Sequence, residues 1–271
     1  MEKLVDIEKV FEEKNPKLLK IMPRFVINYL KRITHEDDVN QRMYELRDVK
    51  DAEFCKAVIE YFGAKVIAKG LENIPRTGGV LFACNHPLGG MDAMALVQVV
   101  HPIRPDIKFI VNDVLLKIDN IKSMFHGVNK HGPTARESLR RVQELFAGDD
   151  AIFIFPAGLV SRRRKGIIRD LEWKKTFITQ AKRNRKPVVP VYLGGRLSNF
   201  FYRLANLRTA LGIKSNIEML YLADEMFKQK GVTIPIVFGK PIPPETFDKS
   251  KSDYEWAQWV KEKAYALKDR L

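Results

Sequence analysis

A histidine and a carboxylate stand six positions apart within the stretch Leu81–Leu96, and both side-chain types can move protons. A carboxylate that holds one imidazole nitrogen fixes the tautomer, so the other nitrogen can accept a proton from a hydroxyl group or from water. No serine separates His86 from Asp92, so the predicted nucleophile is a hydroxyl group of the substrate. His86 and Asp92 are therefore the candidate catalytic pair.

The segments around this pair predict a strand, a tight turn and a helix. Val80–Cys84 is a short apolar run typical of a strand, and a helical pattern begins at Asp92. Pro87 favours an extended backbone at His86, and Gly89-Gly90 allows the chain to turn tightly. Backbone N–H groups of this turn, or of the helix start, are candidate donors to an oxyanion.

A covalent route through Cys84 is an alternative chemistry. Cys84 lies two residues before His86, so both side chains fall on the same face of the predicted strand. A thiolate there is a candidate nucleophile. The competing interpretation is that a cysteine at the end of a buried strand is a small core residue.

Cations follow a second predicted strand. Ala151–Phe155 is a continuous apolar run, as expected of a strand buried on both faces, and it ends in Pro156-Ala157-Gly158. The segment Ser161–Lys165 then brings four consecutive cations to the edge where the catalytic loop also emerges. The pattern indicates an anion-binding loop, and the alternative is an ordinary solvated loop.

Three blocks in order resemble the glycerol-phosphate and lysophosphatidate acyltransferase family: Asn85-His86 with Asp92, then Phe155-Pro156-Ala157-Gly158, then Val189-Pro190-Val191. Members of that family carry a His and an Asp separated by four residues, an F-P-E-G block and a later V-P-V block. The resemblance implies an α/β fold with a mixed β-sheet flanked by helices. It also implies acyl transfer from an acyl thioester to a lipid hydroxyl, without a cofactor or metal.

The resemblance also implies where substrate binds. Lys130 is the nearest basic residue to the place where the family has an arginine that contacts the acceptor phosphate. The candidate substrate-binding residues lie in the matching loops and are Asn85, Gly89, Gly90, Lys130, Gly158, Ser161, Arg162, Arg163 and Arg164. His126 and His131 lack metal-ligand company and are interpreted as loop residues.

Two departures from the family pattern bear on the substrate. Five residues, not four, lie between His86 and Asp92, an insertion that a glycine turn can absorb. Ala157 stands where the family has a glutamate that helps to bind the acceptor head group. The predicted acceptor is therefore a lysophospholipid, glycerol phosphate, lysophosphatidate, lyso-amino-acid lipid or another hydroxylated lipid.

The chain carries a formal net charge of +14 and a pI near 9.7, which favours a polyanionic partner. An acidic acyl carrier protein is the preferred donor over acyl-CoA for this reason, and an anionic membrane surface is a second predicted partner. Nucleic acid is the less favoured reading, because the sequence has no recognisable zinc, RRM or KH signature. A membrane-binding protein without activity is the remaining alternative, and Ala157 supports it.

The chain is expected to divide into a helical region, residues 1–62, and an α/β acyltransferase domain, residues 63–271. Leu18–Ile33 is a basic amphipathic stretch that predicts contact with a membrane interface, or else packing on the main domain. Two cysteines, no signal-peptide pattern and no run of about 20 apolar residues favour a cytoplasmic, peripheral protein at the inner face of the cell membrane.

Four smaller predictions concern local structure. Helices are expected within residues 112–125 and over residues 171–183. Pro190 predicts an edge strand or a bulge. His35 is expected to be a solvated surface group.

Overall fold

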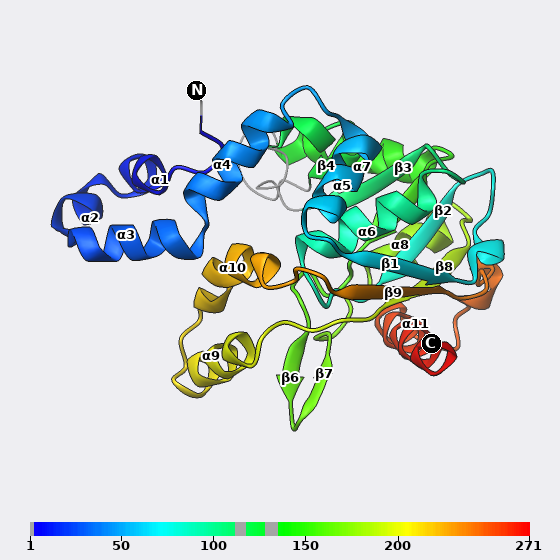
Figure 1. The fold of residues 1–271 in the computed structure, drawn as a ribbon. Coiled ribbons are helices and arrows are strands. Elements are labelled where there is room, and N and C mark those ends of the chain that lie inside the picture. The colour runs from blue at the N-terminus through cyan, green and yellow to red at the C-terminus, as the bar shows by residue number, and fades with distance from the viewer. Residues whose placement is uncertain (1–2, 112–117, 128–134) are drawn as a thin grey trace.

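The computed structural model of the protein describes residues 3–111, 118–127 and 135–271 (Figure 1). The first five elements of the chain are helices, as the sequence predicts. Asn15 caps the second helix by accepting a hydrogen bond from the N–H of Leu18, and the break at Pro23 separates the second helix from the third. These helices are α1 (Ile7–Lys14), α2 (Pro16–Ile21), α3 (Arg24–Ile33), α4 (Glu36–Glu45) and α5 (Asp51–Tyr61).

Seven strands form one twisted sheet in the order β1-β9-β8-β2-β5-β3-β4 (Figure 1). All neighbouring strands are parallel except β8 and β9, which run antiparallel, so the predicted mixed sheet is confirmed. The strands are β1 (Lys65–Lys69), β2 (Val80–Cys84), β3 (Ile107–Val111), β4 (Phe125–Gly127), β5 (Ala151–Ile154), β8 (Val188–Leu193) and β9 (Thr233–Phe238).

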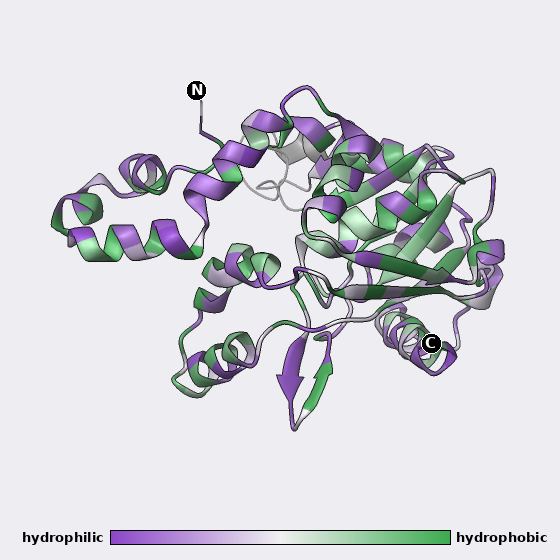
Figure 2. Cartoon of the chain, viewed as in Figure 1, coloured by the Kyte–Doolittle hydropathy of each residue, from purple (hydrophilic) through white to green (hydrophobic). Residues whose placement is uncertain are grey.

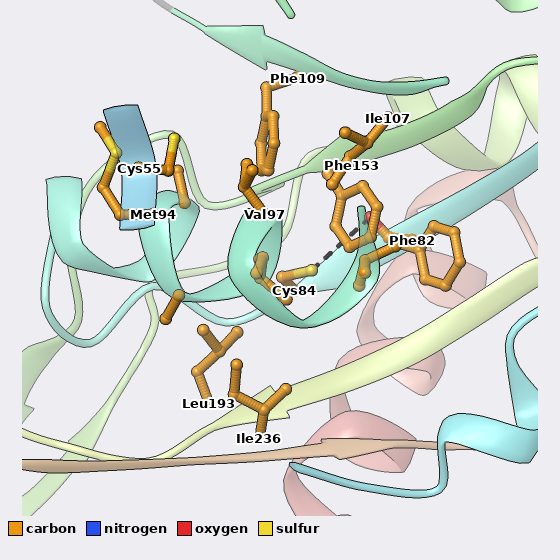
Figure 3. Close-up of a cluster of buried hydrophobic side chains, with 14 of the residues drawn as sticks. Cys55, Phe82, Cys84, Met94, Val97, Ile107, Phe109, Phe153, Leu193 and Ile236 are labelled. Carbon is orange, nitrogen blue, oxygen red and sulfur yellow. Dashed lines mark hydrogen bonds between the residues drawn. The ribbon is translucent and has the colours of Figure 1, made fainter. Parts of the chain in front are cut away.

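Helices cover both faces of this sheet, and β2 lies in its interior with every residue buried. On one face α5 and α6 (Gly90–Val100) pack against the strands, and Figure 3 shows Cys84, Phe82 and Phe153 within that core. On the other face lie α7 (Ala135–Ala147), α8 (Thr176–Arg183) and α11 (Asp253–Ala266). The loop that carries His86 therefore leaves a strand that is fixed from both sides.

A smaller group of elements projects from the sheet. It contains a two-stranded hairpin, β6 (Arg162–Arg164) with β7 (Ile167–Arg169), followed later by α9 (Asn199–Ala210), the 3₁₀ helix η4 (Ile217–Tyr221) and α10 (Leu222–Phe227) (Figure 1). These elements share a small core of their own built on Val160, Leu197, Phe201 and Tyr202. Figure 2 shows β6 as a hydrophilic strand beside the more hydrophobic β7.

The helices before residue 63 differ in their contacts with the sheet. α5 belongs to the main core through Phe54, Cys55 and Ile59, whereas α1–α3 lie apart from the sheet (Figure 1). His35 joins the two regions, because its ring stacks on Phe227 at 3.9 Å and its Nε2 lies 3.2 Å from Asp224. The prediction of a solvated His35 is corrected by these contacts.

Local structure departs from prediction in three places. Of residues 112–125, positions 112–117 lie outside the described residues, and the rest hold a 3₁₀ turn at Asp119–Ile121 and the start of β4, without an α-helix. The helix predicted from residue 171 begins at Thr176. The cationic loop is a hairpin that turns at Lys165 and Gly166, both with positive φ.

Pro190 occupies an interior strand, so it is not an edge residue. The pairing partners of β8 step by one position between Val191↔Phe238 and the bridge Val188↔Ile242. This step is a bulge-like break in register on the side of β8 that faces β9. The extra residue of this step lies between Phe238 and Ile242, on the partner segment, so the edge-strand prediction for Pro190 is wrong and the bulge stays a prediction.

Candidate active site

His86 lies two residues after the end of β2 and beside the first turn of α6. Its Nδ1 is 2.8 Å from Oδ2 of Asp92, so the ring nitrogen donates to a carboxylate that is fully buried. The turn between them places both groups, because Gly89 precedes the helix with φ of 73°, a conformation that favours glycine. The inserted residue therefore leaves the histidine and aspartate in contact.

Three donors converge on a single oxygen of Asp92. The backbone N–H groups of Leu88 and Gly89 donate to Oδ2 at 2.9 and 3.1 Å, beside the bond from His86. Oδ1 is buried without a hydrogen-bond partner in the described part of the chain. Burial raises the pKa of the Asp92 carboxyl, and the hydrogen bonds from His86 and Leu88 oppose that rise.

The imidazole of His86 is held on a second side by an aromatic ring. Phe155, at the end of β5, stacks on it with ring centroids 4.1 Å apart and planes 23° from parallel. Within residues 3–111, 118–127 and 135–271, no protein group forms a hydrogen bond with Nε2. With Nδ1 donating to Asp92, Nε2 is the nitrogen that carries the free lone pair.

Asp170 anchors the backbone of the loop that carries His86, and the sequence did not predict it. Its Oδ1 accepts from the N–H of His86 at 3.2 Å and from the hydroxyl of Ser161 at 2.6 Å. Its Oδ2 accepts from the indole N–H of Trp173 at 2.9 Å. The N–H of Ser161 in turn donates to the His86 carbonyl at 2.8 Å, so both backbone groups of His86 are fixed.

Asn85, predicted to bind substrate, faces the interior. Its side-chain oxygen accepts from the N–H of Leu193 at 2.7 Å, and its amide nitrogen donates to the Leu193 carbonyl at 2.8 Å. Both amide groups are thus committed to the end of β8, and the residue is buried. The structure gives Asn85 the role of joining β2 to β8 beside the catalytic loop.

The three predicted arginines have different surroundings. Arg162 is buried, donates to Glu218 at 2.8 Å and lies with its guanidinium over Phe201, so it faces the interior of the projecting elements. Arg163 lies over the Tyr202 ring and donates to Asn199. Arg164 is exposed at the end of β6.

A hollow of about 800 Å³ lies beside the Phe155-Pro156-Ala157-Gly158 block. Ala157 forms part of its wall, and Arg164, Lys174 and Lys175 are the cations that line it. Gly158 has φ of 70°, and a Cβ there would come within 2.8 Å of Lys174 Nζ. A lysine thus lies against the block in which the related family has a glutamate. Lys130 and His131 lie outside the described residues.

Cys84 is fully buried in the core beside α6 (Figure 3), and its thiol donates to the Phe82 carbonyl at 3.8 Å. Burial raises the pKa of the Cys84 thiol well above its usual value, and the charges of Asp92 and Asp170 act in the same direction. A nucleophilic thiolate is therefore disfavoured, and the core interpretation is the one this geometry supports.

The blocks and the fold together define the class, which is that of the acyltransferases. The chain belongs to the acyltransferase family, because the family model described as "Acyltransferase" matches residues 9–271. The chain is also 47% identical to a "Lyso-glycine lipid O-acyltransferase" of Bacteroides thetaiotaomicron, over 97% of both chains. The class predicted from the sequence, an O-acyltransferase, is confirmed.

A second relative agrees with this assignment, and one solved structure shares the fold. A protein of Phocaeicola vulgatus with the same name is 45% identical over 97% of this chain and 95% of its own. The crystal structure of the 1-acyl-sn-glycerophosphate (LPA) acyltransferase PlsC from Thermotoga maritima matches with a TM-score of 0.53 and 18% identity. It covers 97% of this chain and 96% of the PlsC chain, and it supports the fold.

Proposed function

We propose that this protein transfers a fatty acyl group from an acyl thioester to the hydroxyl of a lyso-lipid, with a lyso-glycine lipid as the acceptor. The names of the two relatives at 45% and 47% identity support the acceptor class. The observation that carries the chemistry is the 2.8 Å contact between His86 Nδ1 and Asp92. It leaves Nε2 as a base for the acceptor hydroxyl.

The proposed reaction is a direct transfer in which His86 acts first as a base and then as an acid. Nε2 takes the proton of the acceptor hydroxyl while the hydroxyl oxygen attacks the carbonyl carbon of the thioester. The tetrahedral intermediate collapses, the C–S bond breaks, and the departing thiolate takes the proton back from the imidazolium. Asp92 stabilises that imidazolium and holds the ring in one orientation.

The start of α6 offers donors for the oxyanion of the intermediate. The N–H of Gly89 is committed to Asp92, so it is not the proposed donor. The N–H groups of Gly90 and Met91 have no hydrogen-bond acceptor in the parts of the chain that the structure describes, and they stand at the positive end of an 11-residue helix. We assign the oxyanion to these two groups.

The hollow beside Ala157 supports an acceptor that carries a carboxylate. A glycine attached to a lipid through its nitrogen keeps its carboxyl group, which is negatively charged at neutral pH. Three cations, Arg164, Lys174 and Lys175, line the hollow against one acidic residue, Glu172. An alanine in place of the family's glutamate leaves out a second negative charge there. The same hollow is where Gly158 comes close to Lys174.

The donor and location follow from charge. An acyl carrier protein is the proposed donor, because acidic carriers suit a surface with a net charge of +14. Across the described part of the chain, every helix is too short or too polar to cross a bilayer. We propose that the basic amphipathic stretch of α2–α3 rests on the inner face of the cell membrane, where the lipid acceptor is found.

The test is an assay of thiol release from acyl carrier protein and from acyl-CoA, with lyso-glycine lipid or lysophosphatidate as the acceptor. His86→Ala is expected to lower kcat at least about 1,000-fold without changing the thermal transition. His101→Ala, at the far end of α6, is the matched control and should keep wild-type kcat. Turnover by His86→Ala would overturn the base assignment, and vesicle binding without thiol release on any acceptor would favour the inactive alternative.

A further inference from the structure

Helix α9 is apolar on two faces, and only one of them is covered. Phe201, Tyr202 and Ala205 are buried against the small core of the projecting elements. Leu207 and Leu211 point away from that core with 57% and 65% of their surfaces exposed. Together with Phe200 and Leu204 they repeat at intervals of four, three and four residues, which places them along one side of the helix.

Neighbouring elements extend this uncovered face. Phe200 packs edge-to-face on Tyr221 of η4 at 4.9 Å, which ties η4 to the exposed side of α9. We call the exposed apolar set the α9 surface, and it consists of Phe200, Leu207, Leu211, Ile213 and Leu220. A monomeric protein rarely leaves such a cluster on one small element without something to cover it.

The unpaired charges beside the α9 surface are mainly positive, because Asp224 and Glu225 of α10 both pair with Lys228. Between Gly195 and Ala223 the sequence contains a single acidic residue, Glu218. That carboxylate is fully buried between Arg162 and Arg208, at 2.8 and 2.9 Å, so it presents no charge to solvent. Exposed cations remain, namely Arg196, Arg203 and Lys214. The occupant must therefore be apolar in its interior and anionic at its boundary.

The α9 surface continues into the N-terminal arm. The hydroxyls of Tyr29 on α3 and Tyr221 on η4 lie 2.6 Å apart, although they are 192 residues apart in sequence. Phe25, one turn before Tyr29, has 73% of its surface exposed. The proposed membrane-contacting helices α2–α3 thus contact η4, which adjoins the α9 surface.

The same projecting elements reach the catalytic turn. A Cβ on Gly89 would lie 3.8 Å from Leu222, and one on Gly90 would lie 3.8 Å from Met226, both residues of α10. α10 directly follows η4 in the chain. A surface bound to α9 and η4 would therefore be linked to the catalytic turn through one short helix.

We propose that the α9 surface is a second membrane contact, which inserts Leu207 and Leu211 among the acyl chains of an anionic bilayer while the flanking cations bind lipid phosphates. The proposal rests on the proposed function in one respect, namely that the acceptor is a membrane lipid. It differs from contact by α2–α3 alone, because it requires two separate parts of the chain to bind the same bilayer. Apolar area buried in lipid supplies the affinity, and the cations supply the selectivity for anionic lipid.

The test is sedimentation with vesicles of phosphatidylcholine containing phosphatidylglycerol, using the full chain. Leu207→Glu combined with Leu211→Glu is expected to weaken vesicle partitioning at least about tenfold. Each change removes a leucine that would enter the bilayer and adds a charge that anionic lipid repels. Ile67→Glu is the matched control, since Ile67 is an exposed apolar residue of β1. It should partition as the wild type does.

A second variant keeps the proposal falsifiable if the double change disturbs folding. Leu211→Trp places an indole on the α9 surface, and brominated lipid is expected to quench the new fluorescence in anionic vesicles. Wild-type partitioning by the double variant, or an indole that is not quenched, would overturn the proposal. If the double variant binds vesicles normally but no longer cross-links to an acidic carrier protein, the α9 surface binds a protein and the membrane proposal is overturned.

An activity measurement separates this proposal from the proposed function. The double variant is expected to stay within about twofold of wild-type turnover on acceptor dispersed in detergent, and to lose turnover on acceptor held in vesicles. If the wild type turns over no lyso-lipid in either form, the proposed function fails, while the quenching result still decides whether the α9 surface enters the bilayer.

Discussion

The proposed catalytic turn, residues 86–92, and the α9 surface treat polar and apolar groups in opposite ways. At the catalytic turn, Asp92 lies in the core and receives three hydrogen bonds on one oxygen, and both backbone groups of His86 are held. On the α9 surface, leucines face solvent, and the carboxylate of Glu218 is buried between two arginines. The turn thus fixes a few polar atoms in place, and the α9 surface exposes apolar side chains to solvent.

The difference separates two tasks of an acyltransferase that works on lipid. Proton transfer needs an imidazole fixed within a few tenths of an ångström, and a strand that is buried on both faces provides that rigidity. Capture of a lipid needs area and charge without one exact pose, and a helix that projects from the sheet provides those. Variants in each region are therefore expected to fail in different measurements.

The largest expected effect is at Asp92. Asp92→Ala removes both the hydrogen-bond partner of Nδ1 and the charge, and kcat is expected to fall about 1,000-fold or more. Asp92→Asn should fall less, about 100-fold, because the amide oxygen can replace Oδ2 while the NH₂ takes the unpartnered Oδ1 position. Steady-state kinetics on detergent-dispersed acceptor measures both, and equal losses would show that hydrogen-bond geometry contributes nothing separate from charge.

The stability of the Asp92→Asn variant should depend on pH with a definite sign. Burial raises the pKa of Asp92 in the folded state above its unfolded value, so the wild type loses stability as pH rises from the unfolded pKa of about 4 through the folded value. Asparagine does not titrate. The melting temperature of the variant relative to wild type is therefore expected to rise between pH 4 and pH 7, and a relative fall would contradict the direction of the shift.

The next prediction concerns Arg162, at the base of the hairpin. The sequence predicts that it binds substrate, whereas the structure pairs it with the buried Glu218. Arg162→Met leaves Glu218 buried with Arg208 alone and is expected to cost about 3 kcal/mol of unfolding free energy. Arg164→Met, two residues on and exposed, is the control and should change stability by less than about 0.5 kcal/mol. Urea denaturation measures both.

The opposite result would return Arg162 to the substrate. If Arg162→Met unfolds at the wild-type urea concentration but raises the KM for the acceptor, its guanidinium contacts substrate and the ion pair with Glu218 is incidental. Arg162→Met combined with Glu218→Met should recover part of the lost stability, because the unbalanced buried carboxylate is then absent.

The strand, turn and helix around His86 agree with the prediction because their signals in the sequence are local. The apolar run of β2, the proline after His86 and the glycines before α6 lie within a few residues of one another, and each fixes one feature of the backbone. The mixed sheet was likewise predictable from strands that alternate with helices. The family resemblance added the order of the blocks, which periodicity alone does not supply.

The features that the sequence did not predict depend on contacts between distant residues. His35 has acidic neighbours in sequence, but Phe227 and Asp224, which hold its ring, come almost 190 residues later. The cations of Arg162–Arg164 look equivalent in sequence, yet only the fold buries the first of them against Glu218. The helix predicted from residue 171 starts late because Trp173 is used in the loop by Asp170.

Asp170 carries the smallest expected effect and tests whether the rigidity of the catalytic turn matters to catalysis. In Asp170→Asn one oxygen becomes NH₂. If the remaining oxygen keeps the bonds to His86 and Ser161, the NH₂ faces the indole N–H of Trp173, and two donors meet. The loop must shift to separate them, and kcat is expected to fall about 10-fold with little change in the acceptor KM.

Relief of that conflict distinguishes a positioning role from a general loss of stability. Trp173→Phe keeps an aromatic ring in the core but removes the N–H, so the double variant Asp170→Asn/Trp173→Phe no longer brings two donors together. Its kcat is expected to recover toward the wild-type value, even though each single change lowers the melting temperature. A double variant that loses the sum of the two single effects would mean that Asp170 acts on stability alone, and the comparison between a rigid catalytic turn and an adaptable lipid surface would then lose its kinetic content.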